Sequence, residues 1–187
     1  MHYVPAGDPN TVLPDMKYTI CFCISGSDVL MIQRKRAPNL NRWNGLGGKI
    51  EPGESALVNV VREIHGEAAI DLIASTRLEF RGIVTWNLQP GTVQEQGMYV
   101  FVARMTEANA QFASLPDCDE GTLAWKPIEW VWDPANDAVA DNLPYFLPRL
   151  WEDSGALWVR CTYDDHRLLD VTLDRLPPEL GNPGEVH

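Results

Sequence analysis

The chain has 187 residues and a mass of 21.0 kDa, with 45% hydrophobic and 22% charged residues, which fits one globular domain with enough apolar material for a core. Its 15 Lys and Arg residues stand against 26 Asp and Glu residues, and the net charge of −11 argues against non-specific binding to DNA, RNA or anionic lipid. The longest apolar run is too short for a transmembrane helix. We therefore expect a soluble, cytoplasmic protein whose partners include neither a nucleic acid polymer nor a membrane.

The N-terminal third predicts a loose arm followed by a β-hairpin. Residues 1–15 contain three prolines and no hydrophobic periodicity, so they are interpreted as an arm in front of the domain. Apolar runs predict strands over residues 18–25 and 29–33, joined by a turn at residues 26–28. Cys21 and Cys23 alternate with Phe22 in the first of these runs, which indicates buried core positions rather than metal ligation.

The rest of the chain predicts an α+β domain over residues 16–176. A Gly-, Asn- and Pro-rich loop over 39–53 precedes a helix over 55–67, whose packed face should hold Leu57, Val61, Ile64 and Ala68. Strands are expected over 77–87, 98–105 and 122–132, the last interrupted at Pro127, then a helix over 143–152 and a hairpin of 156–161 with 168–173 turning at 164–165. Residues 177–187 are expected to form a mobile tail.

Two carboxylates on the first predicted helix draw attention to its chemistry. Glu63 and Glu67 are four residues apart, so they lie about 40° apart on one side of the helix. Like charges at this spacing repel each other, and a hard divalent cation would compensate them. The alternative interpretation is an ordinary solvent-exposed pair, because exposed helices are rich in Glu.

The glycine loop and this acidic helix together resemble the Nudix box, G-x5-E-x7-R-E-U-x-E-E-x-G-U, in which U is aliphatic. The matching positions are Gly48, Glu54, Arg62, Glu63, Ile64, Glu67 and Ile70. The Walker loop and the GxGxxG motif both fail to fit this segment. Two positions depart from the box, since Gly66 replaces a Glu and Ala69 replaces the Gly. The loss of a carboxylate should weaken metal binding, and a glycine inside the helix favours a bend or an early helix end.

The resemblance extends to the branch that hydrolyses oxidised purine nucleoside triphosphates, the 8-oxo-dGTP diphosphatases, through residues 42–49, 119–120 and 141–146. It implies the Nudix fold, a mixed or antiparallel sheet packed between helices in an α/β/α sandwich. It also implies a pyrophosphohydrolase that uses Mg2+, with Mn2+ as an alternative. By this resemblance Glu63, Glu67, Glu120 and the Gly47 carbonyl would hold the metal or activate water, and Arg62 would brace the carboxylates.

The same resemblance implies a nucleotide pocket. Lys49 and Arg34 are candidates for phosphate contact, and each is equally explicable as a surface cation. The implied base pocket has a floor, walls and a polar edge formed by Asn44, Tyr18, Thr19, Trp86, Met98, Asp141 and Asn142. Core packing is the alternative for the two large apolar wall residues. Val139 stands where these relatives carry a stacking tryptophan, which argues against a preference for 8-oxoguanine.

Two classes of function remain open from the sequence. The first is a metal-dependent enzyme that cleaves a nucleoside triphosphate, with an oxidised or modified purine as one candidate, to the monophosphate and pyrophosphate. The second is a nucleotide-binding module with weakened catalysis, which Gly66 favours. Dinucleoside polyphosphates and nucleotide sugars are alternative substrates within the first class.

Overall fold

A computed structural model describes residues 13–87, 89–92, 96–105, 115, 118–152 and 155–180, apart from the side chains of residues 74–76. Its strands are β1 (Asp15–Ser25), β2 (Asp28–Arg34), β3 (Trp43–Asn44), β4 (Thr76–Asn87), β5 (Gln96–Met105), β6 (Gly121–Pro127), β7 (Leu157–Asp164) and β8 (Arg167–Arg175). Its helices are α1 (Ala56–Ala68), α2 (Leu72–Ser75), α3 (Ile128–Val131), α4 (Leu143–Trp151) and the 3-10 turn η1 (Pro178–Leu180).

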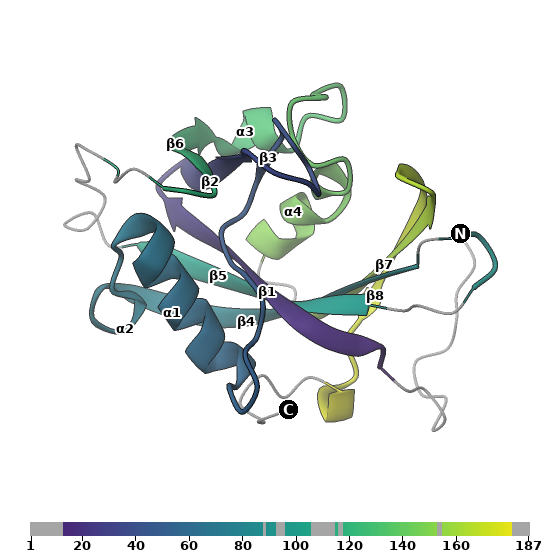
Figure 1. Ribbon diagram of the computed structural model, residues 1–187, viewed down its shortest axis with the longest axis horizontal. Coiled ribbons are helices and arrows are strands. Elements are labelled where there is room, and N and C mark those ends of the chain that lie inside the picture. The colour runs from purple at the N-terminus through teal and green to yellow at the C-terminus, as the bar shows by residue number, and fades with distance from the viewer. Residues whose placement is uncertain are drawn as a thin grey trace.

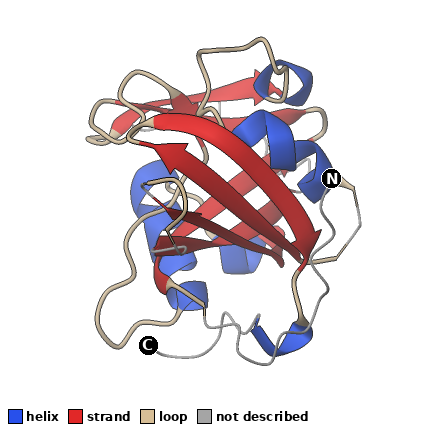
Figure 2. Cartoon of the chain, turned by 90° about the vertical axis from the view of Figure 1, so that its right-hand side faces the viewer, coloured by secondary structure: helices blue, strands red, loops and turns tan. Residues whose placement is uncertain are grey.

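The strands form one mixed, twisted sheet with the order β3-β2-β1-β5-β4-β7-β8, and β6 pairs with β2 outside this path (Figure 2). β1 runs parallel to β5, and β4 runs parallel to β7, whereas the remaining pairs are antiparallel. The predicted hairpins β1–β2 and β7–β8 are both present, and the predicted strands β4 and β5 also pair antiparallel. The predicted fold class, a mixed sheet with helices on its faces, is therefore confirmed.

Helices cover both faces of the sheet, and a separate apolar core lies under each face (Figure 1). The residues of β1 alternate between the two cores. Cys21 and Cys23 pack in the core that also contains the buried side of α1. Ile20 and Phe22 pack in the core that contains the buried side of α4. The predicted core role of the two cysteines is thus confirmed, and both thiols are free and buried.

Helix α1 has sharply defined ends. Ser55 caps its N-terminus by accepting a hydrogen bond from the Val58 backbone N–H, and Ala69 ends the helix in the left-handed conformation with φ of 57°. The expected early end at Gly66 is wrong, since the helix continues to Ala68. The expected burial of Leu57 is also wrong, because its side chain is 44% exposed. The buried face runs through Ala56, Val60, Ile64 and Ala68, which keeps the helical spacing but starts one residue earlier.

Other differences from the predicted elements are local. The strand expected over 122–132 stops at Pro127, and residues 128–131 form α3, because proline cannot donate the next ladder hydrogen bond. The β7–β8 turn lies at residues 165–166 rather than 164–165. The loop predicted over 39–53 contains the two-residue strand β3. At the termini, β1 begins at Asp15, inside the predicted arm, and η1 lies within the predicted tail. Residues 1–12 and 181–187 lie outside the described residues.

Within the described part of the chain, no helix is both long enough and apolar enough to cross a bilayer.

Candidate active site

The glycine loop lies against α1 because two of its residues carry no side chain. Gly47 has a φ of 140°, and a Cβ there would collide with the Thr19 carbonyl of β1. A Cβ on Gly48 would lie 2.5 Å from the carboxyl carbon of Glu63. The Thr19 N–H donates to the Gly48 carbonyl at 2.9 Å, which ties the loop to β1. The sequence therefore brings backbone groups of this loop directly onto the carboxylates of α1.

A charged network fixes Glu63. Arg62 donates from Nη1 to Glu63 at 2.8 Å and from Nε to Glu54 at 2.8 Å, so one guanidinium bridges both carboxylates. These hydrogen bonds and charges hold the pKa of Glu54 at about 2. Arg62 Nη2 also reaches the Lys49 carbonyl at 3.3 Å. Arg62 therefore contacts both Glu54 and Glu63, and its role in catalysis stays a prediction.

Asn59 is a buried organiser of the same region, and sequence reasoning missed it. Its side chain is fully buried, and its Nδ2 donates to the Lys49 carbonyl at 2.7 Å and to Glu54 at 3.0 Å. Its Oδ1 accepts from the Thr19 hydroxyl at 2.5 Å. One side chain therefore joins β1, the glycine loop and the charged network. The only sequence signal is a polar residue on the buried side of an amphipathic helix.

Glu67 has a different environment from Glu63. Its side chain lies almost completely inside, at 6% exposure, and it accepts a hydrogen bond from the Gly47 backbone N–H at 3.0 Å. Burial raises its pKa to about 8, against the lowering effect of this hydrogen bond, and the charges of Glu120 and Glu63 add to the rise. Glu67 is thus a buried carboxylate that gains from any cation placed beside it.

Glu120 and Arg34 face this region from the other side of the loop. Glu120 lies in the turn before β6, with a side chain that is half exposed, and its carboxylate is 3.8 Å from Arg34. Both groups act electrostatically on Glu67. Arg34 also donates to the Pro38 carbonyl at 2.9 Å. The side chain of Lys49, the other predicted phosphate contact, is exposed.

The donor set suits a hard divalent cation without forming a closed cage. Glu63, Glu67 and Glu120 supply carboxylate oxygens and the loop supplies carbonyls, which is the chemistry that Mg2+ and Mn2+ prefer. In the described parts of the chain, no three His, Cys, Asp or Glu side chains are grouped tightly enough to hold a metal ion by themselves. Gly66 stands where the Nudix box has a further Glu. It is exposed, and nothing lies within 4 Å of the position that its Cβ would take, so a side chain at this position would meet open space.

The predicted base wall is only partly assembled. Tyr18 and Trp86 have ring centroids 6.3 Å apart, and Met98 lies opposite Tyr18 in the β1–β5 register. All three side chains are partly buried rather than closed into a core. Thr19, also predicted for the base pocket, does not join this wall. Its side chain points to the α1 side of the sheet, where its hydroxyl donates to Asn59. Its placement in the base pocket was wrong, since neighbouring residues of a strand face opposite sides of the sheet.

The residues predicted for the polar edge contact β7, and Asn44 lies in β3 just before the loop glycines. Asp141 accepts from the Tyr163 hydroxyl at 3.2 Å and lies 3.8 Å from Arg42. Asn142 donates to the Cys161 sulfur at 3.9 Å. Asn44 accepts the neighbouring Gly45 N–H at 2.9 Å with its side chain. Tyr163 was not foreseen, because nothing in the local sequence of β7 connects it with a residue in a distant loop.

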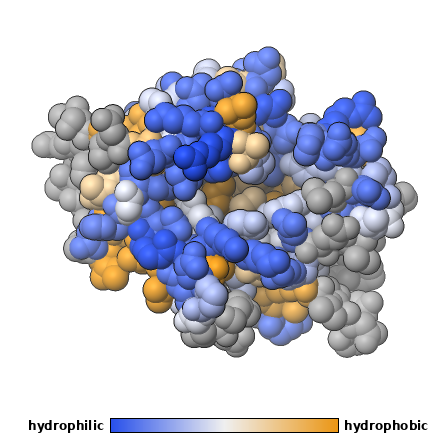
Figure 3. Space-filling view, viewed as in Figure 1, coloured by the Kyte–Doolittle hydropathy of each residue, from blue (hydrophilic) through white to orange (hydrophobic). Residues whose placement is uncertain are grey.

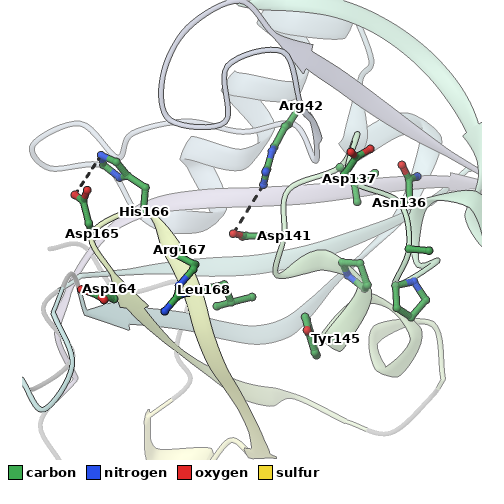
Figure 4. A pocket seen from close by; sticks show the side chains of 14 residues that line it. Arg42, Asn136, Asp137, Asp141, Tyr145, Asp164, Asp165, His166, Arg167 and Leu168 are labelled. Carbon is green, nitrogen blue, oxygen red and sulfur yellow. Dashed lines mark ion pairs between the residues drawn. The ribbon is translucent and has the colours of Figure 1, made fainter.

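The surface of the molecule is hollowed in two places. In the view that shows α1, hydrophilic residues surround a hollow with more apolar residues at its floor (Figure 3). A cavity of about 630 Å³ lies elsewhere along the same loop system, between residues 134–145 and the tip of the β7–β8 hairpin (Figure 4). Arg42, Val139 and Asp141 line it, whereas none of the α1 carboxylates does.

Comparison with known proteins identifies the class. The family model described as NUDIX domain matches residues 16–150, so the chain belongs to the Nudix family. It is 28% identical over 161 residues to the uncharacterized Nudix hydrolase YvcI of Bacillus subtilis (strain 168), a match that covers 84% of this chain and 94% of that protein. With this membership, the chain is a hydrolase that acts on pyrophosphate bonds.

Solved structures agree with the family. A MutT protein of Bacillus halodurans superposes with a TM-score of 0.65 and 25% identity, and the match covers 86% of this chain and 98% of that chain. The protein DR0079 of Deinococcus radiodurans shares the fold, with a TM-score of 0.56, 16% identity, and coverage of 80% of this chain and 91% of the other. The predicted Nudix fold is confirmed by both.

Proposed function

We propose that the chain cleaves a nucleoside triphosphate to the monophosphate and pyrophosphate, with an oxidised or modified purine as the candidate base and Mg2+ or Mn2+ as the cofactor. The observation that carries the proposal is the buried Glu67 carboxylate beside the Gly47 N–H. A carboxylate in this setting favours a divalent cation, because the ion removes the electrostatic penalty of its burial.

Each protein group has a role in this proposal. Glu63, Glu67, Glu120 and the Gly47 carbonyl would hold the ion, which when bound neutralises charge on phosphate oxygens and lowers the pKa of an attacking water. Arg62 positions Glu63 through their 2.8 Å hydrogen bond. Arg34 and the exposed Lys49 would contact the phosphates, since Arg34 ends β2 close enough to act electrostatically on Glu67 and Lys49 directly follows the loop glycines.

The base would lie against the wall of Tyr18, Trp86 and Met98. Asp141 and Asn142 would read its edge, because a carboxylate accepts from exocyclic amines and an amide side chain both donates and accepts. Asn44 would contribute from the loop that leads to the glycines. Val139, in place of a large aromatic residue, supports a base preference other than 8-oxoguanine.

The test is a pyrophosphate-release assay with Mg2+ and Mn2+ on canonical, oxidised and methylated nucleoside triphosphates. We expect turnover that requires the metal and is lost in Glu67→Gln. The exposed Glu129→Gln in α3 is the matched control and should keep full activity. Product analysis distinguishes triphosphates from dinucleoside polyphosphates and nucleotide sugars. Binding of a nucleotide in calorimetry without any turnover would replace the enzyme by the second candidate, a binding module, which Gly66 in place of the box carboxylate favours.

We also propose a cytoplasmic location, a domain over residues 16–176, and small nucleotides rather than nucleic acid polymers as partners. The net charge of −11 supports the last point, because such a surface repels a polyanion.

A further inference from the structure

The cavity in Figure 4 has two walls of different origin. One wall comes from residues 134–145, which lie inside the region that the Nudix family model matches. The other wall comes from residues 164–168 at the tip of the β7–β8 hairpin, which lies beyond the end of that match at residue 150. At about 630 Å³, the cavity is in the size range of small-molecule sites. The hairpin therefore adds a wall that the matched domain alone does not have.

The charges of the lining select a kind of ligand. Four aspartates, Asp137, Asp141, Asp164 and Asp165, line the cavity against the cations Arg42 and Arg167 and the imidazole of His166. This excess of carboxylates disfavours a phosphate group and favours N–H donors or a positive charge. Tyr145 and Val139 add apolar surface. A polar substituent with an amine suits this lining better than an anion does.

Asp141 connects the cavity to the base wall. Its Oδ1 accepts from Tyr163, whose own backbone N–H donates to Asn87 next to Trp86. Its Oδ2 faces Arg42 on the cavity side, as the dashed line in Figure 4 shows. Asp141 is therefore shared between the polar edge of the proposed base pocket and the lining of the cavity.

The proposed function sets which end of the nucleotide lies near the cavity. Arg42 precedes Gly47 by five residues, so their backbones are at most about 17 Å apart, and one nucleotide can reach from the glycine loop to the cavity. With the base edge at Asp141, as proposed, and the phosphates at the glycine loop, the cavity lies at the base end and the cleaved bond lies near α1. A second nucleoside of a dinucleoside polyphosphate would extend from the phosphate end instead, away from this cavity.

We propose that this cavity receives a polar, cationic substituent carried on the exocyclic amine of the substrate's base. The protein then accepts purine nucleoside triphosphates that are enlarged at this amine, and the tip of the β7–β8 hairpin determines this selectivity. The inference rests on the proposed function, because that function places the base edge at Asp141.

The experiment compares each parent (ATP, dATP, GTP and dGTP) with two derivatives of its exocyclic amine, one 2-aminoethyl and one n-propyl. The two substituents have nearly the same size and differ in charge. For the parent with the fastest turnover, we expect the aminoethyl derivative to reach kcat/KM within about threefold of the parent, and to exceed the propyl derivative at least fivefold. Asp164→Asn and Asp137→Asn should each lower the aminoethyl-to-propyl ratio at least threefold.

Asp170→Asn is the matched control, because Asp170 is exposed on β8 but does not line the cavity, and it should leave the ratio unchanged. The proposal is overturned if both derivatives fall more than thirtyfold below a parent that is turned over, or if the ratio ignores both cavity variants. In either case the proposed function stands. If no parent is turned over, the proposed enzyme fails, and the same ratio measured as Kd by calorimetry decides on the cavity.

Discussion

Two carboxylates one turn apart on α1, Glu63 and Glu67, lie in opposite electrostatic situations. Glu63 belongs to a braced cluster with Glu54, Asn59 and Arg62, in which each negative charge is paired with a guanidinium or an amide donor. Glu67 is buried, and among the described residues its hydrogen-bond donor is the Gly47 backbone N–H. The negative charges of the braced cluster are therefore compensated in the folded protein, whereas the pKa of Glu67 is raised to about 8.

This difference assigns different roles to residues of one helix: the braced cluster stabilises the fold, and Glu67 is placed to bind a ligand. The braced cluster sets the position of the glycine loop relative to α1, because both Asn59 and Arg62 hold the Lys49 carbonyl. Glu67 also holds this loop, through the Gly47 N–H, but it carries the penalty of a buried charge. A residue kept at a position where it destabilises the free protein is expected to gain its compensation from a ligand, and a cation is the natural one.

The largest effect is expected at Glu67. Glu67→Gln keeps the size of the side chain and its acceptor for the Gly47 N–H, but removes the charge. We expect turnover to fall about 10³-fold at saturating Mg2+, in the range that loss of a metal ligand or general base produces. Steady-state kinetics of pyrophosphate release measures this. A variant that keeps one-tenth of the wild-type rate would contradict the role of Glu67.

The same variant should make the metal-free protein more stable. A carboxyl whose folded pKa lies near 8, above its unfolded value of 4.5, imposes no penalty below pH 4.5 and a growing one as the pH rises toward 8. At pH 7 the difference is about 3 kcal/mol, and Glu67→Gln should remove it. Urea unfolding in EDTA at pH 5 and pH 7 should show wild-type stability falling with pH and the variant staying level. Saturating Mg2+ should reverse the order of the two proteins at pH 7.

Asn59 tests the braced cluster in the opposite direction. Asn59→Ala leaves the Lys49 carbonyl and the Thr19 hydroxyl with one partner fewer, so we expect a loss of about 2–3 kcal/mol in the free energy of unfolding. Thr19→Val is the control, since it removes only one of these bonds and should lose about 1 kcal/mol. Equal stability of Asn59→Ala and wild type in chemical denaturation would show that the cluster does not hold the loop.

The contrast between Glu67 and Asn59 also shows which site residues can be predicted from the sequence and which cannot. Glu63, Glu67 and Arg62 were found because a fixed spacing along one helix defines them, and their relation is local. Asn59 escaped because its partners, Thr19 and Lys49, come from segments that only the tertiary fold brings together. Thr19 was misplaced for the same reason, since the side of the sheet that a strand residue faces depends on register.

The fold was more predictable than the site. Strands and hairpins of the sheet follow from alternation and turn residues, which are local signals. The parallel pairings β1–β5 and β4–β7, which decide where the loops meet, join strands far apart in sequence and left no local trace. Leu57 was predicted to lie in the core because its spacing fits an apolar helix face. In the folded protein the buried face begins one residue earlier, at Ala56, and Leu57 is exposed.

Gly66 offers a smaller change that would sharpen the contrast between Glu63 and Glu67. Gly66→Glu places a third carboxylate on the open side of the helix, where no atom lies within 4 Å of the new Cβ. We expect the Mg2+ concentration for half-maximal rate to fall about tenfold, which corresponds to about 1.4 kcal/mol of metal binding. Gly66→Ala is the matched control, because it gives the same helix stabilisation of about 1 kcal/mol without a new ligand. The same Mg2+ requirement in both variants would show that the missing carboxylate is irrelevant.

The smallest effect is expected at Ala69, which ends the turn that carries Glu67. Ala69 adopts a φ of 57° in the left-handed region, where an L side chain is strained by about 1 kcal/mol and glycine is not. Ala69→Gly should therefore raise the free energy of unfolding by about 0.5–1 kcal/mol, or Tm by about 1–4 °C. Because Ala69 is exposed, the Mg2+ dependence of the rate should stay unchanged. A shift in that dependence, measured beside the thermal melt, would mean that the helix end itself moves Glu67, so that strain and metal affinity are coupled at this end of α1.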